Sequence, residues 1–489
     1  MMLKAVFKSL AVLLLVSTTM VPFTNDHWQM VGPAIADDDG GDDGDDGDDG
    51  DDDGDDDDSG RSGERNSPSA GEGSGALKRD LNRLRNIFQP RRSEGQTPRR
   101  QRQSPRRSAA PQPAPPPPEF AENEIVTFGL TTEDLAQLLT QNYRLIEERT
   151  LASLANTTIQ RLAVPQGQTL ADARIFVRSL PSGGSADFNH FYRTNEELGA
   201  ELIAQPASTP CKGPHCANRA LVGWSDDLFQ LGTCSGDVTI GMIDTGLNEM
   251  HETFANVDLT VHRLTSEDTP PSRAYHGTAV AALLVGAPDS RSPGLLPKTR
   301  MVAVDAFHRA GSDERADVFT LVDGLSYLAD QNVNVFNLSF AGPPNTVLEQ
   351  AVVELVQTHN KILVASAGNA GPQSDPLYPA AYEPVIAVTA IDRRNSIYRR
   401  AVQGAHIDIA APGVEIWTAA SVKGARWRTG TSFAAPYVSA AAALLLSQSP
   451  ALTPPDVRRI LTDGATDLGA EGRDDVYGHG VVSFDRLCE

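Results

Sequence analysis

Three short motifs hold residue types that can cleave an acyl bond when they act together. Asp244 follows a mostly apolar run, His276 opens a His-Gly-Thr tripeptide, and Ser432 ends a Gly-Thr-Ser tripeptide. A serine hydroxyl becomes an effective nucleophile when an imidazole takes its proton and a carboxylate holds that imidazole in the correct tautomer. Taken singly, an Asp after a strand is a turn residue and a Ser before a helix is a cap. Together and in this order, the three residues predict catalysis by a serine nucleophile.

The tripeptide Asp244-Thr245-Gly246 also has an alternative interpretation, because aspartic proteases use the same three residues. Those enzymes need two carboxyl groups that share one proton, and the sequence contains no second Asp-Thr-Gly. The serine mechanism is therefore favoured.

The elements around the motifs indicate how these residues are positioned. The apolar run 238–243 is typical of a buried parallel strand, so Asp244 is expected at the strand's C-terminal end. The Ala- and Leu-rich stretch after Ser432, which ends near Leu446, predicts a helix. Ser432 is thus expected at a helix N-terminus.

The stretch from residue 217 to residue 489 resembles the subtilisin-like serine proteases. The resemblance rests on the three motifs in the order Asp, His, Ser, and on a Ser-Ala-Gly-Asn sequence that ends at Asn369. It implies an α/β fold with a doubly wound, mostly parallel sheet. It also implies that Asp244 orients His276 and that His276 is the base for Ser432. The side chain of Asn369 and the backbone N–H of Ser432 are then expected to stabilise the oxyanion.

The resemblance also implies a set of substrate-binding positions. These are Ser339, Phe340, Ala341, Gly342, Ala367 and Leu377. Residues 339–342 are expected to pair with the substrate backbone as an extra strand. Ala341 and Leu377 stand where relatives often have Gly, which predicts a shallow, uncharged S1 pocket that favours a small or medium apolar residue before the cut. The alternative is that the alignment near Leu377 is displaced by one or two residues.

Residues 119–194 predict a small α+β domain. Strands are expected at 125–128, 143–148, 158–164 and 188–192, with helices starting at Thr131 and Thr169. The order β-α-β-β-α-β is ferredoxin-like. The resemblance implies an inhibitory propeptide that covers the cleft until a cut is made in the processing linker 195–216, which leaves the peptidase domain 217–489.

The N-terminal residues predict export. Residues 1–36 combine two early lysines, an apolar stretch and a small-residue Ala-Ile-Ala site, which is the pattern of a secretory signal peptide. A membrane anchor is the alternative, but the apolar stretch is shorter than the ~20 residues that span a bilayer. A secreted or periplasmic protein without a transmembrane span is therefore expected.

Residues 37–118 predict a disordered linker, first acidic and then basic and Pro-rich. The run 37–58 contains only 16 Asp and 6 Gly, so the chain's net charge of −22 falls to −6 without it. This distribution argues against a nucleic-acid partner, which would need a basic folded face. A basic amphipathic stretch at 77–88 allows weak peripheral membrane contact.

Four cysteines complete the inventory of reactive residues. Two disulfides are favoured, Cys211 with Cys216 and Cys234 with Cys488, among three possible pairings. A zinc site built on Cys211, His215 and Cys216 is the alternative. No metal or organic cofactor is expected to take part in catalysis. The acidic loop 311–314 is a candidate for a structural calcium site, although such loops are more often solvated turns.

The sequence therefore predicts an exported serine endopeptidase that acts on protein or peptide substrates and is inhibited by its own propeptide. Two other functions stay open. The propeptide can remain attached in a latent protease, or the protease fold can serve as the scaffold of a non-catalytic binding protein.

Overall fold

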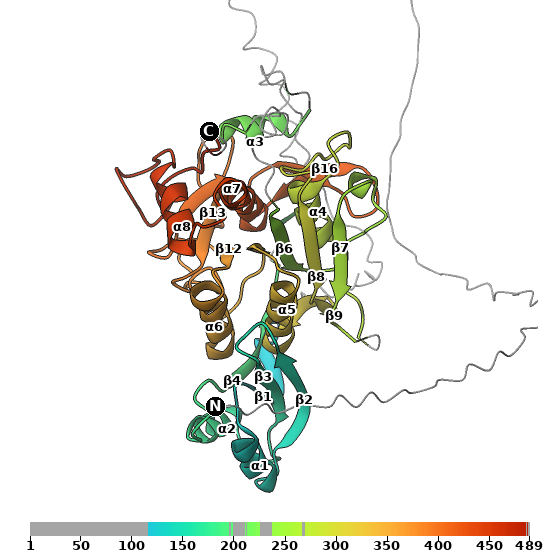
Figure 1. The fold of residues 1–489 in the computed structure, drawn as a ribbon, viewed down its shortest axis with the longest axis vertical. Helices are drawn as coiled ribbons and strands as arrows, with labels where there is room; N and C mark the ends of the chain where they lie inside the picture. The colour runs from blue at the N-terminus through green and yellow to red at the C-terminus, as the bar shows by residue number, and fades with distance from the viewer. Residues whose placement is uncertain are drawn as a thin grey trace, which may run out of the picture. The chain divides into compact units, whose positions relative to one another are not determined.

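The computed structural model describes residues 116–194, 197–198, 211, 213–224, 237–266, 269–485 and 487 (Figure 1). The predictions for residues 1–36 and for the charged stretch before residue 116 lie outside this part of the chain, as do Cys234 and Cys488. Among the described residues, no helix is both long enough and apolar enough to cross a bilayer.

A seven-stranded parallel sheet forms the centre of residues 237–485 (Figure 1). Its strands, in spatial order, are β14 (Ile409–Pro412), β13 (Ile386–Ile391), β12 (Ile362–Ser366), β11 (Val335–Leu338), β6 (Thr239–Asp244), β8 (Arg300–Asp305) and β7 (Leu259–Arg263). The chain enters at β6 and adds later strands on both sides of it. This doubly wound sheet confirms the predicted α/β fold with parallel strands.

Helices cover both faces of this sheet. Helices α4 (Tyr275–Val285) and α7 (Ala435–Gln448) pack on one face, and α5 (Val318–Asp330) and α6 (Thr346–Val353) pack on the other. Successive strand residues point to opposite faces, so Met242 of β6 joins the first hydrophobic cluster while Ile243 joins the second. Both faces of β6 are buried, which explains why its sequence is an apolar run.

Shorter elements complete this part of the chain. They are β5 (Glu197–Leu198), α3 (Cys216–Leu221), the 3-10 turn η2 (Glu252–Phe254), β9 (His308–Ala310), β10 (Asp313–Asp317), the π-helical turn η3 (Glu354–Thr358), β15 (Ile416–Ala419), β16 (Ala425–Thr429), the 3-10 turn η4 (Thr431–Phe433) and α8 (Pro454–Asp463).

Residues 119–194 form a second, smaller layered unit. Its elements are β1 (Phe120–Phe128), α1 (Thr132–Thr140), β2 (Arg144–Leu151), β3 (Thr157–Ala163), α2 (Leu170–Arg178) and β4 (Asp187–Tyr192). The side chains of Thr131 and Thr169 cap the two helices, as expected from their positions. Strand β1 begins before the predicted Ile125, because Phe120 pairs with His190 beyond a shift in register.

The sheet of this small unit continues into the larger one. Its strand order is β2-β3-β1-β4-β10-β9, so β10 extends the antiparallel sheet. One face packs on α1 and α2 through Ile125 and Val177. The other face packs on α5 and α6 through Val126 and Tyr192. The four-stranded sheet of the small unit is therefore held between two layers of helices.

Candidate active site

Asp244 and His276 meet in a buried hydrogen bond at the C-terminal edge of the parallel sheet. Oδ1 of Asp244 accepts from the backbone N of Thr245 and from Nδ1 of His276, each at 2.7 Å. His276 lies in the first turn of α4. A Cβ on the following residue, Gly277, would come within 2.3 Å of the carbonyl oxygen of Thr245. Glycine at 277 therefore allows α4 to approach the end of β6 closely enough for the pair to form.

Ser432 lies next to this pair, in the turn η4 that precedes α7. Its Oγ donates to the carbonyl oxygen of Ser339 at 3.2 Å. The ring of the adjacent Phe433 lies 5.4 Å from the His276 ring, centroid to centroid. Nε2 of His276 is buried and has no hydrogen-bond partner among the described residues. The structure thus forms the Asp–His hydrogen bond and places Phe433, the residue after Ser432, against the His276 ring, while Ser432 itself is bonded to Ser339.

Asn369, which follows β12, is tied to the turn that carries Ser432. Its Oδ1 accepts from the backbone N of Thr431 at 3.0 Å and from Thr431 Oγ1 at 2.9 Å. The carboxamide oxygen of Asn369 therefore already binds the turn η4. A Cβ at Gly430 would come within 3.1 Å of Asn369 Nδ2, so glycine leaves room for the amide there. Thr431 was not singled out from the sequence, although it is the middle residue of the Gly-Thr-Ser motif.

A buried chain of hydrogen-bonded polar side chains connects Ser432 to β11 and α7. Ser439 of α7 donates to Asn337 of β11 at 3.0 Å, and Asn337 donates to Ser339 Oγ at 2.9 Å. Ser339 Oγ then donates to the carbonyl oxygen of Ser432 at 2.9 Å. All four residues are buried. Because each buried group has a partner, the chain fixes the turn relative to the sheet.

The predicted substrate-binding segment 339–342 pairs with the end of the small unit. The backbone groups of Arg193 and Ala341 exchange two hydrogen bonds, at 3.0 and 2.9 Å, in an antiparallel bridge. The hydroxyl of Tyr192 donates to the carbonyl oxygen of Pro343 at 2.7 Å, and its ring lies edge-on to Phe340. Residues 192–193 thus lie along this segment as an added strand.

Two of the predicted pocket residues, Ala341 and Leu377, lie next to the glycine that precedes Asn369. A Cβ at Gly368 would be 2.6 Å from Leu377 Cδ1 and 3.5 Å from the Cβ of Ala341. Ala367, which follows β12, is fully buried. The side chain of Leu377 therefore fills the space next to the Gly368 backbone, beside Ala341.

A second carboxyl group, Asp305, lies beside Asp244. It ends β8 and is the register partner of Asp244. It accepts from Ser272 Oγ at 3.1 Å and lies 3.8 Å from Arg263 Nε, and Ser272 Oγ also accepts from the backbone N of Gly246 at 2.7 Å. Burial raises the pKa of Asp305 to about 6. The sequence signal was available, since Asp305 follows an apolar run just as Asp244 does.

The two acidic residues of the loop 311–314 do not lie in the solvated turn that was expected. Asp313 and Glu314 belong to strand β10 and are partly buried. Asp313 binds Arg193 and Arg315, and Glu314 accepts from the backbone N of Arg273. Their carboxylates are already engaged by cationic or backbone groups, which makes them poor calcium ligands. The expectation of a solvated turn was therefore wrong for these two residues.

The structure joins Cys211 and Cys216 in a disulfide, with their Cα atoms 5.7 Å apart. Together with His215 they are the one group of metal-ligand residues close enough to share an ion within the described part of the chain. Since the two sulfurs are bonded to each other, neither is a free thiolate for the zinc site considered above.

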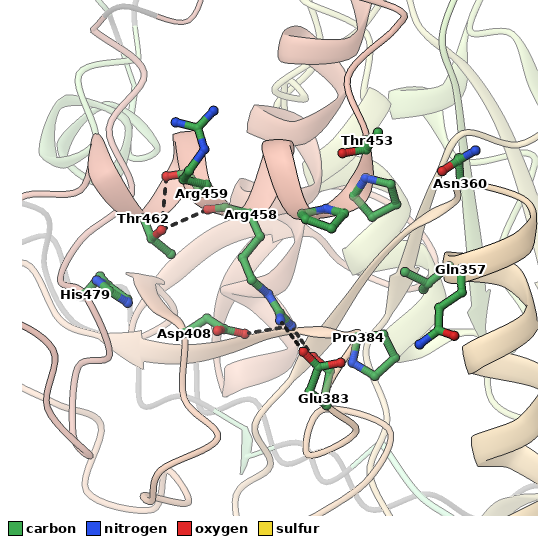
Figure 2. A pocket seen from close by; sticks show the side chains of 13 residues that line it. Gln357, Asn360, Glu383, Pro384, Asp408, Thr453, Arg458, Arg459, Thr462 and His479 are labelled. Carbon is green, nitrogen blue, oxygen red and sulfur yellow. Dashed lines mark hydrogen bonds and ion pairs between the residues drawn. The ribbon is translucent and has the colours of Figure 1, made fainter.

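A pocket of about 580 Å³ lies between η3, the start of β14 and α8, and it is separate from the predicted catalytic residues (Figure 2). Arg458 crosses it and binds Asp408 Oδ2 at 3.4 Å and the carbonyl oxygen of Glu383 at 2.7 Å. None of the predicted catalytic residues lines it. Its one arginine–aspartate pair links α8 to the start of β14, which is a structural role.

Asp305 generates a testable prediction about pH and stability. Its pKa in the fold is about 6, above the ordinary value of 3.8, so ionising it costs free energy that appears as the pH rises from about 4 to above 6. The variant Asp305→Asn carries no such cost. In a Ser432→Ala background that prevents autolysis, the free energy of unfolding of Asp305→Asn relative to the parent should rise by about 3 kcal/mol between pH 4 and pH 8.

Urea unfolding at several pH values measures this difference. The exposed Asp289→Asn makes the same charge change as a control, and its effect should stay within about 0.5 kcal/mol. A difference for Asp305→Asn that does not grow with pH would contradict the prediction.

Comparison with known proteins places this site in a family. The model of the subtilase family matches residues 235–480. Subtilisin DY of Bacillus licheniformis is 29% identical over 269 residues, which cover 54% of this chain and 96% of that protein. A subtilisin of Bacillus pumilus is 30% identical over 269 residues, covering 54% and 94%.

A solved structure shows the same fold. Fervidolysin from Fervidobacterium pennivorans, described as a keratinolytic enzyme related to subtilisin, superimposes with a TM-score of 0.63 at 19% identity. The match covers 76% of this chain and 61% of that one. Since the family model spans the whole stretch that carries Asp244, His276 and Ser432, the chain belongs to the subtilase family and is a serine endopeptidase.

Proposed function

We propose that this protein is an exported endopeptidase that uses Asp244, His276 and Ser432 and is held inactive by residues 119–194 until they are cut away. The observation that carries the proposal is the buried 2.7 Å hydrogen bond between Asp244 Oδ1 and His276 Nδ1, with Phe433, the residue after Ser432, against the same histidine ring. The export step rests on the predicted signal peptide. A disulfide between Cys211 and Cys216 supports an oxidising compartment, either secreted or periplasmic.

The roles of the three residues follow from which atoms are already bonded. Asp244 holds Nδ1 of His276 as the protonated nitrogen, which leaves Nε2 free to act as the base. Ser432 exchanges its hydrogen bond to Ser339 for one to Nε2, gives up its proton and attacks the substrate carbonyl carbon. His276 then passes that proton to the leaving amine. Water hydrolyses the acyl-enzyme by the same proton transfers in reverse order.

Charge that develops on the attacked carbonyl oxygen needs fixed donors. Asn369 commits its oxygen to Thr431, so its amide nitrogen is oriented away from that contact and toward the space above Gly430. We assign that amide and the backbone N–H of Ser432 as the two donors. In a subtilisin, loss of the equivalent side-chain donor costs about 10²–10³ in turnover, and a similar loss is expected here.

Residues 119–194 fit the role of an inhibitor because they cap two helices of the peptidase part. The first N–H groups of a helix have no partner within the helix. Asp187 accepts from the backbone N and Oγ1 of Thr346 at the start of α6, and Asn189 accepts from Phe319 N at the start of α5. Burial alone would raise the pKa of Asp187, but hydrogen bonds from Thr346 and Arg174 hold that pKa below its ordinary value.

Two strand pairings bracket the bond that we propose is cut. Arg193 pairs with Ala341, and Glu197 pairs with Thr429, three residues before Ser432. Asn195 lies two residues after Arg193 in the sequence, and Ser339, whose carbonyl oxygen accepts from Ser432 Oγ, lies two residues before Ala341. We therefore propose that the enzyme cuts its own chain after Asn195.

The S1 pocket is proposed to be shallow and uncharged. The side chain of Leu377 occupies the space beside Gly368, and the methyl group of Ala341 lies next to it. A small or medium residue before the cut fits such a pocket. Asn195, the residue before the proposed cut, is small and uncharged, although it is polar.

The Ser432→Ala variant tests the catalytic proposal. Both proteins would be expressed with export, treated with a fluorophosphonate probe and analysed by intact mass spectrometry. Wild type should be labelled and shortened, while Ser432→Ala should be unlabelled and keep residues 119–194. Wild type that is labelled at full length would identify a latent protease. Absence of labelling even after residues 119–194 are removed would favour the non-catalytic binding protein.

Leu377→Gly tests the pocket. Removing the side chain should open the pocket, and kcat/KM for a peptide with Phe before the cut should rise about tenfold relative to one with Ala. Leu377→Met keeps the volume and should keep the wild-type preference. A wild-type enzyme that strongly prefers Arg or Lys at that position would refute an uncharged pocket.

A further inference from the structure

Arg193 forms a bidentate ion pair with Asp313, an aspartate of the peptidase part. Its Nε lies 2.7 Å from Oδ1 of Asp313, and its Nη2 lies 2.9 Å from Oδ2 of Asp313. The two side chains are 22% and 15% exposed. Two parallel, charge-assisted hydrogen bonds at such distances match the geometry in which a carboxylate selects a guanidinium over other groups.

The backbone of Arg193 is fixed independently of this ion pair. It exchanges two hydrogen bonds with Ala341, and the preceding Tyr192 pairs with Ala316 of β10 on the opposite side. The residues that end the small unit therefore form the middle strand between the segment 339–342 and β10. A strand that is hydrogen-bonded on both edges holds its side chains in fixed positions. The backbone pairing therefore places the Arg193 side chain next to Asp313.

The charges on β10 favour a cation at this place. Its five residues include three acids, Asp313, Glu314 and Asp317, against one base, Arg315. Arg315 lies 3.2 Å from Asp313 Oδ2 and over the ring of Phe191. Arg315 and Arg193 thus both contact the Asp313 carboxylate, and the one base of β10 does not balance its three acids. Burial alone would raise the pKa of Asp313, but Arg193 and Arg315 hold that pKa below its ordinary value.

We propose that Asp313 is a specificity-determining residue that selects an arginine three positions before the bond to be cut in protein substrates. The inference rests on the proposed function, in which a substrate strand occupies the place that residues 192–193 hold now. Asp313 and β10 belong to the peptidase part, so they stay behind when residues 119–194 leave. The chain's own Arg193 would then be the first example of the arginine that later substrates must supply.

The experiment compares two quenched-fluorescence peptides on the processed enzyme. Both carry the sequence of residues 191–197, but one has citrulline in place of arginine, which keeps the shape and removes the charge. Wild type should cleave the arginine peptide with about tenfold higher kcat/KM. Asp313→Asn should bring the ratio close to one, and Asp289→Asn, the same change at an exposed residue in another part of the peptidase, should keep it tenfold.

The outcomes separate this inference from the function on which it rests. Equal cleavage of both peptides by wild type would overturn the role of Asp313 and leave the endopeptidase intact. An arginine preference that persists in Asp313→Asn would also overturn it, because another group would then be responsible. Cleavage of neither peptide by an enzyme that fluorophosphonate does not label would contradict the proposed function, and the inference would fall with it.

Discussion

The buried hydrogen bond between Asp244 and His276 is the contact on which the rest of the site depends. It joins the end of β6 to the first turn of α4, and it forms only because glycine at 277 lets the helix approach the strand. A carboxylate that is fully buried needs such a partner, since an unpaired charge at this depth would be strongly destabilising. The same bond fixes Nδ1 of the imidazole, and Nε2 is left without a partner among the described residues, so stability and chemistry are served by one contact.

The parallel sheet explains why residues from distant parts of the chain converge here. Carboxyl ends of parallel strands meet at one edge of a sheet, and a doubly wound sheet opens a crevice at that edge. Asp244 and Asp305 end neighbouring strands, and Asn369 follows a third. Ser432 reaches the same edge from the start of α7, where the chain of buried polar side chains from Ser439 to Ser339 holds it. Little of this arrangement is free to move without breaking a buried hydrogen bond.

Under the proposed function, inhibition and substrate binding use the same surface. The small unit covers α5 and α6 with its sheet and supplies hydrogen-bond acceptors for their first turns through Asp187 and Asn189. Its last strand then runs between β10 and the segment 339–342. A strand bound in this way presents its own backbone as a substrate would. Under the proposed function, the contacts that hold the inhibitor in place therefore also present its chain for cleavage.

Much of the fold could be predicted from local patterns, and some of the site could not. The apolar run before Asp244, the caps Thr131 and Thr169, and the Gly-Thr-Ser motif each carry their meaning within a few residues. The pairing of β10 with β4 joins segments that are far apart in sequence, and no local sequence pattern predicts this pairing. Asp313 was misread for that reason: its residue type and neighbours are those of a surface turn, and only the strand pairing shows that it faces Arg193. Asp305 escaped notice because its meaning depends on which strand lies beside Asp244.

The central claim is that residues 191–193 lie between β10 and the segment 339–342 as a substrate would, and that the chain cuts itself beside them. The most direct test is the N-terminal sequence of the processed enzyme, determined by mass spectrometry on protein purified after export. The account predicts a mature chain that begins at Glu196, which follows from the pairings of Arg193 and Glu197 on either side of the bond. A mature chain that begins within residues 200–216 would contradict it, because that bond would lie outside the stretch that the two pairings enclose.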